Sequence, residues 1–293
     1  MTFPVLRILQ GLLQPKIDKI TQQLKDLQPY QWGSLALNQL VSKRGYHVQT
    51  NIAYGLKARQ RLDLYISHTK GVHPLVVFVH GGAWSKGSKE DYRFFGESLT
   101  QAGYDVAIIN YHLAPEHKFP SYIKDLHDAL QFLVRQANRL GVSADQIALI
   151  GHSAGAFNVA SLLYHPVQLE QDLLSRVKVM IGLAGPYHFN YVGDVVAEPA
   201  FDLLVPYQQV MPYYFVQSNH IQHYLFLAEQ DQLVKDHNSE DLQQQLHLEK
   251  NHCEIIRIPR TNHISLMAST ARIFTPFFQT RKQLLWALQK GFN

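Results

Sequence analysis

From about residue 46 to the end of the chain, short apolar runs alternate with longer helical patterns, and this alternation constrains the fold more than any other feature. Strands are expected at 47–54, 61–67, 75–80, 105–110, 146–150, 177–183, 223–228 and 254–258. Helices are expected at 92–102, 121–140, 154–164, 236–248 and 265–288. The run LVVFVH at 75–80 is apolar throughout, as in a strand that is covered on both faces. The sequence therefore predicts an α/β fold with a mostly parallel central sheet covered by helices on both faces.

The first 45 residues have a different pattern from the rest. Their apolar residues recur every three or four positions, which is typical of an amphipathic helix, although Pro15 interrupts the run. We therefore predict an N-terminal helical arm at 1–45 and a catalytic domain at 46–293, a length that suits one large α/β domain. The favoured interpretation is an arm packed on the domain. The alternatives are homodimerisation or contact with a membrane surface.

Prolines and aromatic residues are concentrated at 186–219, between two predicted strands. The segment is too long for a simple loop. We interpret it as a small cap-like insertion over the site. The alternative is a plain crossover helix with a long lead-in.

Composition excludes several classes of function. The formal charge is +4, but no run of Lys or Arg concentrates it, so no nucleic-acid partner is expected. No stretch of eighteen apolar residues predicts a transmembrane segment, and the N-terminus makes a poor signal peptide. The single cysteine, Cys253, rules out an intrachain disulfide and is expected in a buried strand. No zinc-type spacing is present, so no metal or other cofactor is predicted, and the expected location is cytoplasmic.

The motif Gly151-His152-Ser153-Ala154-Gly155 follows a predicted strand directly and opens a predicted helix. In that context G-x-S-x-G is a nucleophile elbow, a strained turn that lifts the serine hydroxyl above the sheet. Side chains two residues to either side would collide with neighbouring elements, so glycine is needed there. Ser153 is the predicted nucleophile of an acyl-transfer reaction.

A serine hydroxyl is a weak nucleophile and needs a base that is oriented by an acid. Proteins with this elbow place the acid and then the histidine after the serine in the chain. Asp231 lies just past the strand at 223–228, where it can reach the serine. The rival acids are Asp194 and Asp202 in the predicted insertion, the neighbouring Glu229, and Asp236, the expected N-cap of the next helix.

Sixteen histidines compete for the role of base, and chain order removes all that precede Asp231. His237 and His247 are expected on a helix, and His252 precedes the last strand. His263 follows that strand by a short loop and opens the final helix. It is the predicted base.

The developing oxyanion needs hydrogen-bond donors. The sequence His80-Gly81-Gly82-Ala83-Trp84 follows the strand at 75–80, and its glycines let the backbone come close to a substrate. The predicted oxyanion hole combines the amides of Gly82 and Ala83 with that of Ala154.

The HGGAW and GHSAG motifs, together with the run NYHLAPEHKFP at 110–120, resemble those of the HGGxW-type α/β-hydrolases. These are small carboxylesterases and kynurenine formamidases related to the hormone-sensitive-lipase group. The resemblance spans about residues 46–290 and leaves 1–44 outside. It implies an α/β-hydrolase fold, a triad of Ser153, Asp231 and His263, and an oxyanion hole that includes Gly82 and Ala83.

Ala83 departs from the neighbouring lipases, many of which carry a third glycine there, and should disfavour bulky tertiary-alcohol esters. Asp125 lies on the helix expected at 121–140. The resembling family carries a similar acid on the corresponding helix, and the resemblance implies a structural role for it. His80 and Trp84 are interpreted as supports of the oxyanion loop. The elbow is expected to point His152 away from the triad.

These predictions describe a serine hydrolase that cleaves small carboxylic esters through an acyl-enzyme, a carboxylesterase whose partner is a small-molecule ester. The first alternative is an arylformamidase that hydrolyses N-formylkynurenine. The second is a non-catalytic α/β-hydrolase-like binding protein, which would have no need of the three triad residues.

Overall fold

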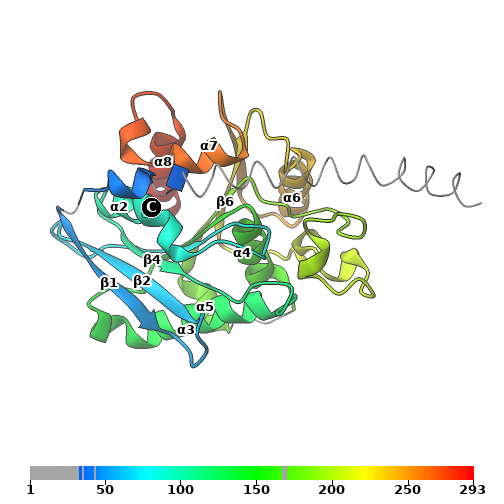
Figure 1. Ribbon diagram of the computed structural model, residues 1–293, viewed down its shortest axis with the longest axis horizontal. Coiled ribbons are helices and arrows are strands. Elements are labelled where there is room, and N and C mark those ends of the chain that lie inside the picture. Colours follow the sequence, from blue (N-terminus) through cyan, green and yellow to red (C-terminus); the bar gives the residue numbers. More distant parts are fainter. Residues whose placement is uncertain (1–32, 35, 43, 167–169) are drawn as a thin grey trace, which may run out of the picture.

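An eight-stranded sheet runs through the described part of the chain in the order β1-β2-β4-β3-β5-β6-β7-β8 (Figure 1). The computed structural model describes residues 33–34, 36–42, 44–166 and 170–293. The strands are β1 (Tyr46–Ala53), β2 (Arg61–Ser67), β3 (Leu75–Val79), β4 (Asp105–Ile109), β5 (Ile147–His152), β6 (Val177–Leu183), β7 (Gln222–Ala228) and β8 (Cys253–Ile258). β2 pairs antiparallel with β1 and β4, and every other neighbouring pair is parallel. The mostly parallel sheet predicted from the apolar runs is confirmed.

Helices cover both faces of this sheet. They are α2 (Arg93–Thr100), α3 (Ser121–Leu140), α4 (Ala154–Tyr164), α5 (Gln171–Arg176), α6 (His237–Leu248), α7 (His263–Ala268) and α8 (Thr280–Phe292). Side chains of β3 point alternately to the two faces, because the side-chain period of a strand is two. Val77 joins a core cluster with residues of α3, α4 and α6, whereas Phe78 joins another with residues of α2, α7 and α8. The strands are therefore buried on both sides, as their continuous apolar runs predicted.

The single helix expected at 265–288 was wrong, since the structure divides this stretch into α7, the 3-10 helix η5 (Arg272–Phe274) and α8. The hydroxyls of Ser269 and Thr270 donate back to the carbonyls of Leu266 and Met267 and compete with the helical pattern. Pro276 then lacks the N–H that a continuing helix needs. The short helix α5 was not expected at all.

Between β6 and β7, the stretch 186–219 forms three 3-10 helices, η2 (Glu198–Ala200), η3 (Tyr207–Gln209) and η4 (Pro212–Phe215). The alternative of a plain crossover α-helix was therefore wrong. Stacked rings of Tyr191 and Phe201, 4.5 Å apart, pack inside the segment. It lies beside α6 at the right of Figure 1.

Most of the predicted N-terminal arm, residues 1–32, lies outside the described residues. Of the rest, Leu37 is buried in the same core cluster as α2. The Asn38 side chain joins the 3-10 helix η1 (Lys89–Tyr92) to the start of α2, because it donates to the Glu90 carbonyl (2.8 Å) and accepts from the Phe94 amide (3.0 Å). This end of the arm packs on the domain.

Candidate active site

A pocket of about 500 Å³ opens where β3, β5 and β7 end. Its walls come from the loops after these strands, the start of α7 and the first part of the 186–219 segment. Ser153, His263 and Gly82 all line it. Parallel strands end at the same edge of a sheet, so residues far apart in the chain converge there, and ligands of open α/β sheets bind at that edge.

The turn at Ser153 has the strained geometry of a nucleophile elbow. Its backbone lies at φ 53° and ψ −123°, and its amide donates to the Leu183 carbonyl (2.8 Å). A Cβ at Gly151 would lie 2.3 Å from the Gly155 oxygen, and one at Gly155 would lie 2.1 Å from the Val79 oxygen. The predicted need for glycine on both sides of the serine is therefore explained by backbone contacts that leave no room for a methyl group.

His263 and Asp231 are hydrogen-bonded, with 2.8 Å between Nδ1 and Oδ2. The Asp231 side chain is 3 % exposed, and its other oxygen accepts the amides of Leu233 (2.9 Å) and Val234 (3.0 Å). Burial alone would raise the pKa of Asp231, but these hydrogen bonds and the charge of His263 outweigh it and lower the pKa. The carboxyl therefore stays ionised and fixes the orientation of the His263 ring.

None of the four rival acids is hydrogen-bonded to His263. Asp194 lines the pocket but uses Oδ1 to cap the amides of Val196 and Ala197. Asp202 caps the Leu204 amide, Glu229 accepts from the Arg260 amide, and Asp236 forms an ion pair with Arg257.

The histidines that follow Asp231 are also distributed as expected. His237 and His247 lie on α6, and His252 precedes β8. Among the described residues the Ser153 hydroxyl forms no hydrogen bond, and Ser153 and His263 line the same pocket.

The loop after β3 has an unusual backbone. Gly82, Ala83 and Trp84 all have positive φ, at 118°, 49° and 57°. A tight turn holds it, since the amides of Ser85 and Lys86 both donate to the Gly82 carbonyl. Gly82, Ala83 and Ala154 line the pocket together, and Ala154 begins α4, where an amide has no partner within the helix.

Two side chains support this loop as predicted. The indole of Trp84 donates to Asn158 Oδ1 (2.9 Å), and the ring of His80 stacks on Tyr111 at 4.4 Å. Asp125 lies outside the pocket lining and accepts from the backbone and ring of His112 and from Gln60. Its contacts are those of a structural acid.

The expectation that His152 points away from the triad was wrong. Its ring lines the pocket and lies 5.1 Å from the ring of His263, and its Nε2 is 3.2 Å from the His263 carbonyl. The direction of this side chain depends on where α7 packs, which the elbow motif does not specify.

Two residues near the site were missed. Asn158 anchors Trp84 from one turn further along α4. Arg59, from the β1–β2 connection, donates to the carbonyls of Tyr111 (2.6 Å) and Gly87 (3.0 Å) and so fixes the end of the loop after β3. Neither lies in a local motif, because each acts through a contact between distant parts of the chain.

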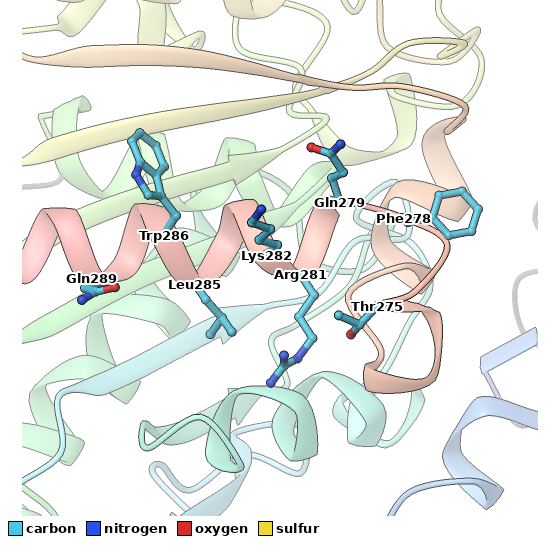
Figure 2. Close-up of a pocket in the computed structure, with 8 residues that line it drawn as sticks. All are labelled: Thr275, Phe278, Gln279, Arg281, Lys282, Leu285, Trp286 and Gln289. Carbon is cyan, nitrogen blue, oxygen red and sulfur yellow. The ribbon is translucent and has the colours of Figure 1, made fainter.

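A second depression lies along α8 (Figure 2). Its side chains diverge: Trp286 and Gln279 lie on one side of the helix, and Leu285 and Arg281 on the other. Its described lining holds neither an acid nor a histidine, so it lacks two of the three residue types of a serine-hydrolase triad.

Across the ranges that the structure describes, no three His, Cys, Asp or Glu side chains are grouped as metal ligands would be. Cys253 is buried in β8 as expected, and burial raises the pKa of its thiol. No helix in the same ranges has the length and hydropathy needed to cross a membrane.

Comparison with known proteins finds an esterase and a formamidase among the proteins of similar sequence. An isoprenylcysteine alpha-carbonyl methylesterase from Arabidopsis thaliana is 32% identical over 154 residues, which cover 50% of this chain and 36% of that protein. A kynurenine formamidase from Drosophila melanogaster is 30% identical over 158 residues, 54% of this chain and 51% of that protein. The chain thus matches about a third to a half of the length of these relatives.

Solved structures share the fold. Esterase B from Lactobacillus rhamnosis superposes with a TM-score of 0.72 at 16% identity, covering 96% of this chain and 94% of that one. The α/β-hydrolase fold that the motifs implied is confirmed. Residues 62–246, more than half of the chain, match the BD-FAE family. The chain belongs to the BD-FAE family of α/β-hydrolases.

Proposed function

We propose that this chain is a serine hydrolase that cleaves small carboxylic esters through an acyl-enzyme. The observation that carries the proposal is the 2.8 Å hydrogen bond of Asp231 with His263, which lines the same pocket as Ser153. A binding protein would need no buried carboxylate to orient a histidine beside a serine on a strained turn, so this pairing favours catalysis.

In the proposed mechanism, neutral His263 takes the proton of Ser153 as the hydroxyl attacks the ester carbonyl. The negative charge that develops on the carbonyl oxygen is stabilised by the amides of Gly82, Ala83 and Ala154. His263 then gives its proton to the leaving alcohol. Water, activated by the same base, hydrolyses the acyl-enzyme.

Small, fairly apolar esters fit the walls of the pocket. Apolar side chains line it from three directions: Trp84 from the oxyanion loop, Phe189 and Val196 from the 186–219 segment, and Leu233 and Ile264 from the loops that carry the acid and the base. We interpret the 186–219 segment as a cap, because it supplies one wall. By its name the Arabidopsis relative is a methylesterase, which supports ester chemistry here.

The second candidate is the hydrolysis of N-formylkynurenine. The Drosophila relative is by name a kynurenine formamidase, and the same triad chemistry would cleave a formamide. Trp84 and Phe189, whose rings are nearly parallel at 6.4 Å, could contact an aromatic substrate. We place it second because the many apolar walls suit an acyl chain larger than formyl.

The test is a panel of aryl esters and N-formylkynurenine assayed at equal enzyme concentration, with wild-type protein and Ser153→Ala. The variant should lose about four orders of magnitude in kcat on the best ester. Ser143→Ala is the matched control, because this partly exposed serine precedes β5 at the opposite end of the strand. It should keep full activity. If Ser153→Ala keeps a tenth of the rate, the proposed nucleophile is wrong.

A further inference from the structure

His152 occupies a special place, because it lies between the two loops that would perform the chemistry. It ends β5, immediately before Ser153, and is 4% exposed. On one side its ring faces the start of the oxyanion loop, and on the other the start of α7. The proposed mechanism gives it no part in proton transfer.

Contacts on both sides fix the position of the ring. Nε2 lies 3.2 Å from the backbone oxygen of His263, and the two imidazole rings are 5.1 Å apart at 40°. A Cβ at Gly81 would lie 3.0 Å from His152 Nδ1 and 3.0 Å from Ser153 Cβ. The imidazole therefore fills the space between the oxyanion loop and the base, and Gly81 is what makes room for it.

The charge state follows from the surroundings. Burial lowers the pKa of His152 to about 3, and the neighbouring charge of His263 acts in the same direction, as does the nearby His80. The His263 carbonyl and the carboxylate of Asp231 oppose this less strongly. The ring is therefore neutral at physiological pH and has a single N–H. A carbonyl can only accept, so that proton is on Nε2.

We propose that His152 is a positioning residue that donates its Nε2–H to the His263 carbonyl and thereby holds the proposed base at the correct distance from Ser153. The inference rests on the proposed function. The hydrogen bond restrains the first residue of α7, and the bulk of the ring sets the gap between that residue and Gly81. His263 is then fixed at both ends, by Asp231 on its ring and by His152 on its backbone.

The effect should appear in kcat and not in KM, because His152 would act on the geometry of proton transfer. A displacement of about 1 Å at a reacting group can cost about a hundredfold in rate. His152→Leu keeps much of the volume but removes the donor, so kcat should fall about a hundredfold with KM within about threefold of wild type. His152→Gln places an amide N–H near the position of Nε2, so it should restore kcat to within about fivefold.

His220→Leu is the matched control. Its Nε2 lies 3.0 Å from the Val177 carbonyl, so it forms the same kind of bond, but at the opposite end of the strands from the pocket. Its kcat should equal that of wild type. Thermal unfolding of all three variants shows whether each remains folded at the assay temperature.

The experiment measures kcat, KM and the pH profile of kcat/KM on an aryl butyrate for wild type, the three variants and Ser153→Ala. Nitrogen-15 NMR of the wild-type imidazoles reports the tautomer of His152 even if a variant does not fold. Two results support the proposal. The first is a loss of kcat in His152→Leu that is recovered in His152→Gln. The second is a His152 ring that stays neutral, with its proton on Nε2, from pH 5 to 8. Equal kcat in folded His152→Leu and wild type, or a proton on Nδ1, overturns it. Absence of Ser153-dependent turnover in the wild type would instead overturn the proposed function.

Discussion

Replacing Gly155 by alanine should disturb both the stability of the domain and its site. Gly155 is the second residue of α4, where the helix presses directly on β3. A Cβ there would lie 2.1 Å from the Val79 oxygen and 2.6 Å from the His80 oxygen. Helix and strand would have to separate by about 0.9 Å merely to bring the nearer contact to 3.0 Å. Both obstacles are backbone atoms, which cannot rotate away as a side chain can.

The expected change in the free energy of unfolding on Gly155→Ala is the difference between two effects. Alanine favours the helix by about 1 kcal/mol relative to glycine. Overpacking typically costs about 1–3 kcal/mol and sometimes more, and an overlap with two carbonyls lies beyond the upper end of that range. We expect a net loss of at least about 3 kcal/mol, which in a domain of this size lowers Tm by about 6 °C or more.

Thermal unfolding followed by circular dichroism measures the change, with Gly141→Ala as the control. Gly141 ends α3 at φ 74° with no atom within 4 Å of an added Cβ, so the substitution costs only the left-handed backbone, about 1 kcal/mol. The Gly155 variant should also lose at least about tenfold in kcat below its Tm, since His80 leads into the oxyanion loop. If its Tm is within 2 °C of wild type, about the effect of 1 kcal/mol, or above that of Gly141→Ala, the packing argument is refuted.

Four further predictions concern the site, the stability at acid pH and the arm. Asp231→Asn should lower kcat by about 10⁴ with KM nearly unchanged, because it holds the wrong tautomer of His263; a larger loss in Asp194→Asn or Asp202→Asn would contradict the assignment. The folded state lowers the pKa of Asp231, so the ionised carboxyl stabilises the fold above the unfolded carboxyl pKa of about 3.9. This contribution is lost as pH falls below that value. The free energy of unfolding in urea should therefore change less with pH on the acid side in the Asn variant than in wild type. Aryl esters with acyl chains of about two to six carbons should react faster than longer ones, because each methylene that fits gains up to about 0.8 kcal/mol of burial and one that does not fit causes strain. An aryl butyrate should exceed N-formylkynurenine in kcat/KM. If N-formylkynurenine is instead the better substrate by about tenfold, the formamidase is favoured. Deleting residues 2–27 should change solubility or association more than turnover, and a hundredfold fall in kcat, about 2.7 kcal/mol, would show that the arm lines the site.

Most of the sheet could be predicted because each strand is a short apolar run bounded by turn residues. The predictions at 61–67, 121–140 and 154–164 match the bounds of β2, α3 and α4. The stretch after His263 could not be divided correctly, because its apolar spacing continues through 265–288 while local side-chain bonds and Pro276 end the helix. The 3-10 turns of 186–219 have no periodicity that a sequence pattern could reveal.

The candidate site also contains residues that local sequence patterns identified and residues that they did not. Ser153, Asp231 and His263 were identified because each lies at or shortly after the end of a strand. The structure places Ser153 and His263 in one pocket and joins Asp231 to His263 by a hydrogen bond, whereas their catalytic roles remain predictions. Asn158 and Arg59 were missed because their partners are 74 and 28 to 52 positions away in the chain. The direction of His152 was mistaken for the same reason: it is decided by α7, which lies 111 positions further on.

The helix α4 supports nearly all of the proposed machinery except the base and its acid. It begins at Ala154, directly after Ser153, places Gly155 against the strand that leads into the oxyanion loop, and reaches that loop again through Asn158 and Trp84. The proposed nucleophile and oxyanion donors are therefore held by one rigid element. The proposed acid lies in the loop after β7, and the proposed base is the first residue of α7. These two segments are joined by the hydrogen bond from the Gln230 amide to the Thr261 carbonyl (2.8 Å) and by the His263–Asp231 pair. The contact from His152 to the His263 carbonyl connects these two halves of the proposed site. This connection is why we propose that a residue with no part in proton transfer affects its rate.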